Sequence, residues 1–256
     1  MQLEGRVALV TGGGRGIGLG CSRALAEKGA DIALTYRKDE ESASAAAEEL
    51  KKLGRRAVAF QCDVSQEDQV QSAVKEVIDA FGKVDILVAN AGVASRGNSV
   101  RDTSTAEWRR LFDTHVMGSV WCCQAVIDSM REQGRGHIIL ITSVATRSHG
   151  ANGAPYSMAK SAMDSLMKAL YKEEGPNGIR VNAIGPGLVE TEMGRRLMKA
   201  TRGVENLKDL YATFPFDRIC QPEDIGNLAA FLCTDEGSYV NGQTIYVDGG
   251  GFVRSA

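Results

Sequence analysis

The chain has 256 residues, of which 43% are hydrophobic and 24% charged, with a formal net charge of -2. These values fit a globular domain with a full core and give no support to nucleic-acid binding, which usually needs a basic face. No apolar run reaches the roughly 18 residues of a membrane span, and a secretion signal is lacking. We therefore expect a cytoplasmic protein with no membrane or nucleic-acid partner. The six cysteines have no C-x-x-C spacing, so we expect reduced packing residues and no metal site.

The first segment has the pattern of a phosphate-binding turn. An apolar strand is predicted over residues 6–10, followed by Thr11-Gly12-Gly13-Gly14-Arg15-Gly16-Ile17-Gly18 and by a helix over residues 19–29 that Gly29 ends. Glycines let a backbone approach a ligand, and a helix N-terminus offers free N–H groups and a positive dipole. The spacing T-G-x-x-x-G-x-G differs from the usual dinucleotide fingerprint. Such a turn is often only a turn, but the flanking strand and helix favour a nucleotide site.

The end of the second predicted strand, residues 30–36, indicates which nucleotide is bound. NAD sites usually carry an acidic residue there for the ribose 2′-hydroxyl. This chain has Arg37 instead, which together with Arg15 could grip a 2′-phosphate. We therefore expect NADP(H) as the preferred cofactor over NAD(H), with two solvated surface arginines as the simpler alternative.

The rest of the chain alternates strands and helices. Further strands are predicted at residues 57–61, 84–89, 136–142, 179–184 and 243–247, and helices at residues 41–53, 66–81, 105–132 and 222–233 and from Pro155 onward. This alternation predicts one α/β domain over residues 1–256, with a doubly wound parallel sheet flanked by helices. The polar, less regular segment of about residues 188–213 has the length and place of a substrate lid.

Three further positions have two interpretations each. Asp63, after the third strand, could cap the next helix or contact an adenine, and both are possible at once. Asn90-Ala91-Gly92, after the fourth strand, is a plain turn signal that could also line a cofactor groove. His115 lies on the apolar stripe of the long helix, where a histidine is usually a core residue.

The stretch 143–160 carries the candidate chemistry. Ser143 ends a buried strand, Pro155 can open a helix because its missing N–H is not needed in the first turn, and Tyr156 and Lys160 then share one helical face. A free tyrosine titrates near ~10, but a neighbouring ammonium favours the phenolate and lowers its pKa. Tyr156 could then exchange a proton with a substrate oxygen that Ser143 holds by a hydrogen bond.

Together these motifs resemble those of the short-chain dehydrogenase/reductase family over essentially the whole chain. The matching residues, in family-like order and spacing, are Thr11, Gly12, Gly16, Gly18, Asp63, Asn90, Ala91, Gly92, Ser143, Tyr156, Lys160, Pro186, Gly187, Thr191 and Val247-Asp248-Gly249-Gly250. The resemblance implies a Rossmann-like sheet of seven strands and hydride transfer between a nicotinamide and a carbonyl or alcohol. It also implies a homotetramer or homodimer.

The same resemblance assigns roles to residues. It implies Tyr156 as the acid-base group, Ser143 as the group that orients the carbonyl, and Lys160 as the pKa partner and ribose ligand. Cofactor contacts are expected from Gly12, Arg15, Gly16, Ile17, Gly18, Arg37, Asp63, Val64, Asn90, Ala91, Gly92, Tyr156, Lys160, Pro186, Gly187, Val189 and Thr191. One departure is His115, which stands where many members have asparagine in a D-x-N-x-x-G pattern. A neutral imidazole can donate and accept, so His115 could carry the same catalytic proton relay or could only pack.

These features favour an NADPH-dependent oxidoreductase that interconverts a small ketone or aldehyde and an alcohol, with a small carbonyl compound, polyol or cyclic alcohol as substrate. A 3-oxoacyl-[acyl-carrier-protein] reductase is one alternative, in which Arg131 and Arg135 could contact the acidic carrier. The mixed or acidic run at residues 172–177 weakens that alternative. A non-catalytic nucleotide-binding sensor is the other, and the intact serine, tyrosine and lysine speak against it.

Overall fold

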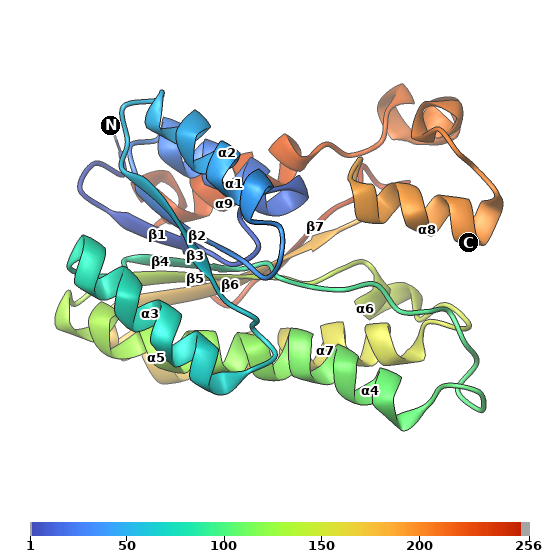
Figure 1. The fold of residues 1–256 in the computed structure, drawn as a ribbon, viewed down its shortest axis with the longest axis horizontal. Helices are drawn as coiled ribbons and strands as arrows, with labels where there is room; N and C mark the ends of the chain where they lie inside the picture. The colour runs from blue at the N-terminus through green and yellow to red at the C-terminus, as the bar shows by residue number, and fades with distance from the viewer. Residues whose placement is uncertain (1, 252–256) are drawn as a thin grey trace.

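Seven parallel strands form a single sheet at the centre of the protein (Figure 1). The structure is a computed structural model and describes residues 2–251. In sheet order the strands are β3 (Ala57–Gln61), β2 (Asp31–Tyr36), β1 (Val7–Val10), β4 (Ile86–Ala89), β5 (Gly136–Ile141), β6 (Ile179–Pro186) and β7 (Thr244–Val247). Every neighbouring pair is parallel, so the predicted sheet is confirmed.

Helices cover both faces of this sheet. In Figure 1, α1, α2 and α9 lie on one face, and α3, α5 and α7 lie on the other. The α-helices are α1 (Gly16–Glu27), α2 (Glu40–Lys51), α3 (Glu67–Phe81), α4 (Thr105–Phe112), α5 (Gly118–Glu132), α6 (Ala145–Ser148), α7 (Ala154–Glu174), α8 (Glu192–Arg202) and α9 (Pro222–Cys233). Short 3₁₀ segments lie at Gly175–Asn177, Leu207–Thr213, Pro215–Asp217 and Asp235–Gly237. Coverage of both faces explains why the strands are continuous apolar runs.

The hydrophobic core has one half on each face of the sheet. Leu25 of α1 and Ile225 of α9 belong to the first half, and Val77 of α3, Val126 of α5 and Met167 of α7 belong to the second. All five side chains are fully buried, and each such burial stabilises the fold by about 1.5–3 kcal/mol. The two halves hold the strands rigidly, so groups at the strand ends have fixed positions.

The winding of the chain changes direction between β1 and β4. From β1 the chain adds β2 and β3 on one side, then crosses back to add β4 to β7 on the other. Crevices for ligands in open α/β sheets form at such a switch point, outside the carboxyl ends of the strands. The sheet therefore places the glycine-rich turn after β1 beside the residues that follow β4 and β5.

The first helix starts earlier than the sequence predicted. It begins at Gly16 and ends at Glu27, whereas we expected residues 19–29. Gly16 and Gly18 were assigned to the turn because glycine disfavours helix, but here they build the first helical turn. Gly29, with a φ of 108°, lies just beyond the end and turns the chain towards β2.

The predicted long helix over residues 105–132 is divided by a π-helical turn, Asp113–Met117, between α4 and α5. A π-turn adds a residue to one helical turn and is frequent at functional sites. His115 lies inside this turn and is 1% exposed. The histidine therefore enters the interior from a widened part of the helix.

The segment 188–213 is more regular than predicted. It contains α8, an 11-residue helix that is capped by the Thr191 side chain, which accepts a hydrogen bond from the Gly194 N–H. Of the residues in α8 only Gly194 is buried. The helix escaped prediction because it has no buried apolar stripe of the kind that marks a helix packed on a core.

The cysteines are free thiols, and five of the six are buried, as expected for reduced packing residues. Burial raises the pKa of Cys21 to about 12, so this thiol stays uncharged at neutral pH. Across residues 2–251, no helix combines the length and the apolar character that crossing a membrane requires.

Candidate active site

The glycine-rich turn between β1 and α1 has the shape of a cradle for a diphosphate. Gly12 and Gly16 have φ values of +63° and +52°, which disfavour any other residue. A Cβ on Gly18 would lie 2.2 Å from the carbonyl oxygen of Gly12. The helix can therefore lie this close to the turn only because residue 18 is a glycine. The N-terminus of α1 has no side-chain cap, which leaves its first N–H groups available to an anion.

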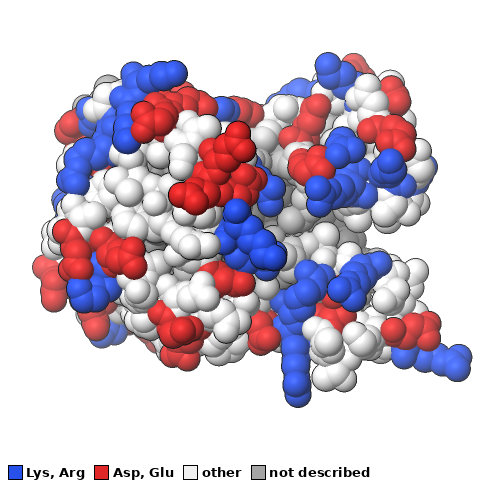
Figure 2. Space-filling view, viewed as in Figure 1, with Lys and Arg blue, Asp and Glu red and all other residues white. Residues whose placement is uncertain are grey.

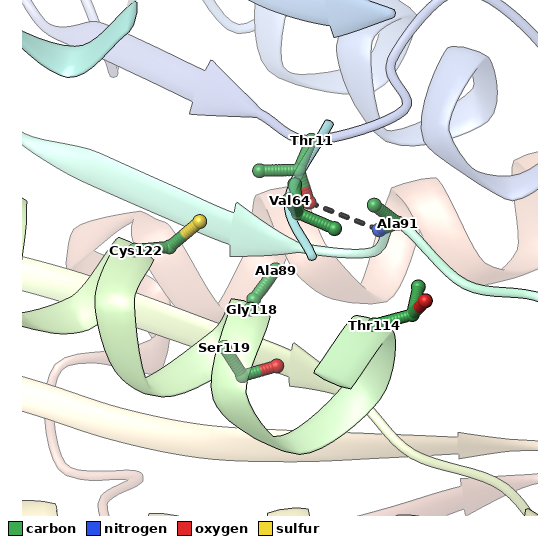
Figure 3. Close-up of a pocket in the computed structure, with 8 residues that line it drawn as sticks. All are labelled: Thr11, Val64, Ala89, Ala91, Thr114, Gly118, Ser119 and Cys122. Carbon is green, nitrogen blue, oxygen red and sulfur yellow. Dashed lines mark hydrogen bonds between the residues drawn. The ribbon is translucent and has the colours of Figure 1, made fainter. Parts of the chain in front are cut away.

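Thr11 holds this turn against the segment that follows β4. Its hydroxyl oxygen accepts hydrogen bonds from the N–H groups of Asn90 and Ala91, each at 2.9 Å. Figure 3 shows the contact to Ala91 above a narrow pocket with no room for a water molecule. The pocket is lined by Thr11, Val64, Ala89, Ala91, Thr114, Gly118, Ser119 and Cys122. Val64 and Ala91, both predicted cofactor contacts, thus line this pocket.

Asn90 supports the turn from the other side. Its side-chain amide donates to the carbonyl oxygens of Thr11 at 2.8 Å and Gly12 at 3.4 Å. We predicted Asn90 as a cofactor contact, and the structure gives it this direct task in shaping the cradle. The hydroxyl oxygen of Thr35 in β2 accepts a hydrogen bond from the Gly12 N–H at 3.2 Å. No sequence motif indicated this contact.

The two arginines predicted to bind a 2′-phosphate lie at the end of β2 and in the glycine-rich turn. An Nη1 atom of Arg37 is 3.9 Å from a carboxylate oxygen of Asp63, and Arg15 is 3.4 Å from Asp39. Arg15 and Arg37 have side chains that are 72% and 50% exposed. Both are therefore only loosely held and available to a phosphate.

Asp63 does not cap α3, which was one of its two predicted roles. The N-cap of α3 is Gln66, and the Asp63 carboxylate instead accepts hydrogen bonds from the N–H and the hydroxyl of Ser65 at 3.1 and 2.7 Å. This closes a local turn. It fixes the carboxylate beside Arg37.

Ser143, Tyr156 and Lys160 meet where β5 ends and α7 begins. Pro155 stands in the first turn of α7, as predicted. The buried Lys160 Nζ donates to the carbonyl oxygen of Ile141 at 2.6 Å and lies 5.7 Å from the centre of the Tyr156 ring. The Ser143 hydroxyl oxygen accepts the Ala145 N–H at 3.1 Å, which leaves its proton free to be donated.

Burial shifts the pKa values of Tyr156 and Lys160. It raises the pKa of Tyr156, an effect that a hydrogen bond from Ser143 partly offsets, and it lowers the pKa of Lys160 to about 7. We expected the lysine to lower the pKa of the tyrosine. The net direction is opposite because desolvation disfavours both charged forms. The protein alone therefore favours a protonated phenol and an amine that changes charge near neutral pH.

His115 lies beside Tyr156. The two rings are perpendicular, with centres 5.4 Å apart. The His115 Nε2 is 2.8 Å from the carbonyl oxygen of Val93 and 3.2 Å from its nitrogen. The shorter contact favours the tautomer in which Nε2–H donates.

That tautomer makes His115 Nδ1 an acceptor, and this buried atom has no hydrogen-bond partner among the described residues. Burial lowers the pKa of His115 to about 3, so the ring is neutral. A Cβ on Gly92 would lie 2.6 Å from the His115 ring, which shows how closely the ring packs. The free Nδ1 suits a relay and the tight packing suits a core residue, so the catalytic role of His115 stays a prediction.

The segment after β6 closes the site from the far side. A Cβ on Gly16 would lie 3.3 Å from the Thr191 Cγ2, so the base of α8 touches the diphosphate cradle. Glu190 anchors the segment by accepting hydrogen bonds from Tyr211 at 2.5 Å and Gln221 at 2.8 Å. Tyr211 and Gln221 had no sequence signal because they are 21 and 31 residues away from Glu190.

Three other predicted contacts lie on the same side of the site. The carbonyl oxygen of Pro186 accepts the Val144 N–H at 3.0 Å, and the Gly187 N–H donates to the Val247 carbonyl at the same distance. Val189 is 4% exposed and bridges to Cys220. Backbone hydrogen bonds therefore fix residues 186–189, where the segment 188–213 begins.

A hollow of about 290 Å³ lies within the segment 188–213 and is lined by Glu190, Thr191, Glu192, Arg195, Glu205, Asn206 and Leu207. Figure 2 shows the surface hollowed between the lobe that carries α8 and the lobe that carries α4, with lysine and arginine side chains on both sides. Aspartate and glutamate side chains lie among them, so both signs of charge surround the hollowed surface.

Known proteins resemble this chain along nearly its whole length. A family model described as enoyl-(acyl carrier protein) reductase matches residues 12–251. A 3-oxoacyl-[acyl-carrier-protein] reductase of Staphylococcus epidermidis is 36% identical over 244 residues, which cover 95% of this chain and 97% of that protein. A solved short-chain dehydrogenase of Burkholderia cenocepacia in complex with NADP is 34% identical, with a TM-score of 0.88 and coverage of 98% and 100%. NAD⁺-bound xylitol dehydrogenase is 30% identical, with a TM-score of 0.90 and the same coverage.

Proposed function

The chain belongs to the short-chain dehydrogenase/reductase family of oxidoreductases, and we propose that it interconverts a small ketone or aldehyde and the corresponding alcohol with NADP(H). The observation that carries the proposal is the group formed by the partly buried Ser143 and Tyr156 and the buried Lys160, beside a glycine cradle that fits a diphosphate. A phenol, a hydroxyl and an amine at one point serve proton transfer to an oxygen atom.

Each member of the trio has a separate task in the proposed reaction. The glycine cradle and the residues around it would hold the cofactor, whose nicotinamide would supply the hydride for the carbonyl carbon. Tyr156 donates its proton to the carbonyl oxygen, and its raised pKa keeps the phenol protonated at neutral pH. Ser143 holds the same oxygen by its free O–H. Lys160, whose pKa is about 7, can gain or lose a proton near Tyr156 at neutral pH.

The preference for NADP(H) is part of the proposal. The exposed Arg15 and Arg37 support it, because guanidinium groups bind phosphate in two-point geometry. The Burkholderia cenocepacia relative was solved with NADP, whereas xylitol dehydrogenase was solved with NAD⁺. Since these two relatives were solved with different cofactors, the proposed preference for NADP(H) rests on Arg15 and Arg37.

A carrier-bound substrate is the second candidate, because the Staphylococcus epidermidis relative is a 3-oxoacyl-[acyl-carrier-protein] reductase. One contact weakens it here. Arg131 makes a two-point ion pair with the buried Glu174, at 2.7 and 3.0 Å. Arg135, 3.6 Å from Asp85 and 48% exposed, is held more loosely. Since Arg131 already binds a carboxylate of this chain and residues 172–177 are mixed or acidic, we favour a free small molecule.

NADPH oxidation by the purified protein tests the proposal. The assay uses a panel of ketones, aldehydes and cyclic ketones together with acetoacetyl-carrier protein, and Tyr156→Phe serves as control. We expect turnover of at least one small carbonyl compound and loss of that turnover in the control. Binding of NADPH without turnover on any member of the panel would favour a nucleotide sensor. Turnover confined to the carrier substrate would favour the second candidate.

Two further predictions accompany this function. We propose that the protein forms a homodimer or homotetramer, as the family resemblance implies, and that it is located in the cytoplasm. Light scattering on the purified protein gives the oligomer mass directly, and fractionation of cells gives the location.

A further inference from the structure

A chain of hydrogen bonds joins the last strand of the sheet to Ser143. The Tyr246 hydroxyl lies 2.7 Å from Thr146 Oγ1, and Thr146 Oγ1 lies 2.9 Å from the carbonyl oxygen of Ser143. The Thr146 N–H also donates to that carbonyl, at 3.1 Å. Residues 100 positions apart in the sequence therefore fix one carbonyl beside the candidate active site.

The direction of these bonds follows from the atoms involved. A carbonyl oxygen can only accept, so the Thr146 hydroxyl must give its single proton to Ser143. Thr146 Oγ1 must then accept from Tyr246, which makes the tyrosine the donor. The series runs from the Tyr246 O–H through the Thr146 O–H to the Ser143 carbonyl, and loss of either hydroxyl breaks it.

The Tyr246 ring is itself held on two sides. The guanidinium carbon of Arg147 lies 3.7 Å from the ring centre, a distance at which a cation is attracted to the ring face. A Cβ on Gly185 would lie 2.6 Å from Tyr246 Cδ1, so only glycine allows the ring to lie against β6. These two contacts hold the ring with its hydroxyl directed at Thr146 Oγ1.

We propose that Tyr246 is a positioning residue for Ser143, acting through Thr146 and held in place by Arg147. The Ser143 hydroxyl is oriented from its own backbone, because it accepts from the Ala145 N–H in the same turn. A turn that is fixed at its carbonyl therefore fixes the hydroxyl that faces Tyr156. This inference deepens the proposed function, on which its catalytic consequence rests.

The consequence is measurable at Tyr156. The titratable and polar groups that face it are Ser143, His115 with ring centres 5.4 Å apart, and Lys160 with Nζ 5.7 Å from the ring centre. Only Ser143 is connected to Tyr246 by the series above. If the serine loses its position, the phenolate of Tyr156 loses a donor and the pKa of Tyr156 rises.

The experiment compares Tyr246→Phe, Thr146→Val and the double variant with wild type. Tyr239→Phe is the matched control, because Tyr239 is fully exposed. Phenolate absorbance against pH is recorded for each protein and for its Tyr156→Phe derivative, and the difference isolates Tyr156. We expect the midpoint for Tyr156 to rise by about 0.5–1 pH unit in both single variants. This titration needs no substrate, so it separates the inference from the proposed function.

Kinetics on any carbonyl compound that wild type reduces give the second readout. We expect kcat to fall about tenfold in each single variant and no further in the double variant, because the two hydroxyls act in series. The KM for NADPH stays unchanged, and Thr146→Ser restores kcat. Unchanged Tyr156 titration in Tyr246→Phe and Thr146→Val overturns the inference, as do losses of kcat that multiply in the double variant.

Discussion

Replacement of Lys160 by methionine should stabilise the protein while it removes activity. Lys160 is 3% exposed and stands next to Met163, whose sulfur is 3.6 Å from Nζ. The site thus has apolar surroundings that suit a methionine of similar length. The cost of keeping an amine there depends on its charge, and therefore on pH.

The magnitude follows from the pKa of Lys160, which burial lowers from 10.5 to about 7. At 1.36 kcal/mol for each pH unit, the charged amine costs the fold about 5 kcal/mol well below pH 7. Methionine cannot donate to the carbonyl oxygen of Ile141, which loses its hydrogen bond from Lys160. This loss lowers the free energy of unfolding by about 1–3 kcal/mol. We therefore expect Lys160→Met to raise the free energy of unfolding by about 2–4 kcal/mol at pH 6.

The pH dependence has a definite sign. Between pH 7 and 10.5 the unfolded chain binds more protons at Lys160 than the folded protein does, so wild-type stability rises with pH across this window. The advantage of the methionine variant must shrink over the same window and vanish between about pH 8.5 and 10. Near pH 10.5 only the lost hydrogen bond remains, so the variant is then less stable than wild type by about 1–3 kcal/mol. Below pH 7 both states hold the proton, and the advantage is constant.

Urea unfolding of wild type and Lys160→Met at pH 6, 8 and 9.5 measures this difference. Lys168→Met is the matched control on the same helix, because Lys168 is 59% exposed and paired with Asp164 at 2.7 Å. The control variant should show no increase in the free energy of unfolding at pH 6. The reasoning is refuted if Lys160→Met is less stable than wild type at pH 6, or if its advantage is the same at all three values.

Three other changes test separate parts of the site. Arg37→Ala should raise the KM for NADPH about 10- to 100-fold, because a charged hydrogen bond to the 2′-phosphate is lost. The KM for NADH should stay nearly unchanged, and equal effects on both cofactors would show that Arg37 does not bind the 2′-phosphate. Gly18→Ala should abolish NADPH binding in a fluorescence titration, because its Cβ would lie 2.2 Å from the Gly12 carbonyl oxygen; retained affinity would contradict the proposed cradle. His115→Asn should keep or raise kcat and His115→Leu should lower it about 10²-fold, whereas a lower melting temperature with an unchanged rate per folded molecule in both would mark His115 as a packing residue.

The sheet was predictable because its strands are buried on both faces. Continuous apolar runs such as residues 86–89 and 136–141 leave a strand as the simplest interpretation. Alternation with helices then fixes a parallel sheet, and glycine at residue 82 marks a helix end through its φ of +86°. These are local signals, and the fold follows from them.

Features that depend on tertiary contacts were not predictable. The π-turn at Asp113–Met117 has no local signature, because it depends on how the helix packs. The direction of the Tyr156 pKa was wrongly predicted since it depends on burial, which spacing along a helix does not show. The Asn90 amide bonds to the backbone of residues 11 and 12, a contact between segments far apart in the sequence that no local pattern indicated.

The most direct test of the central claim is a single comparison of wild type with Tyr156→Phe. NADPH affinity is measured by fluorescence, and NADPH oxidation is followed with a ketone that wild type reduces. The account predicts equal affinity and a loss of turnover of about 10²- to 10⁴-fold, since only the proton donor is removed. Turnover by the phenylalanine variant at the wild-type rate would contradict it.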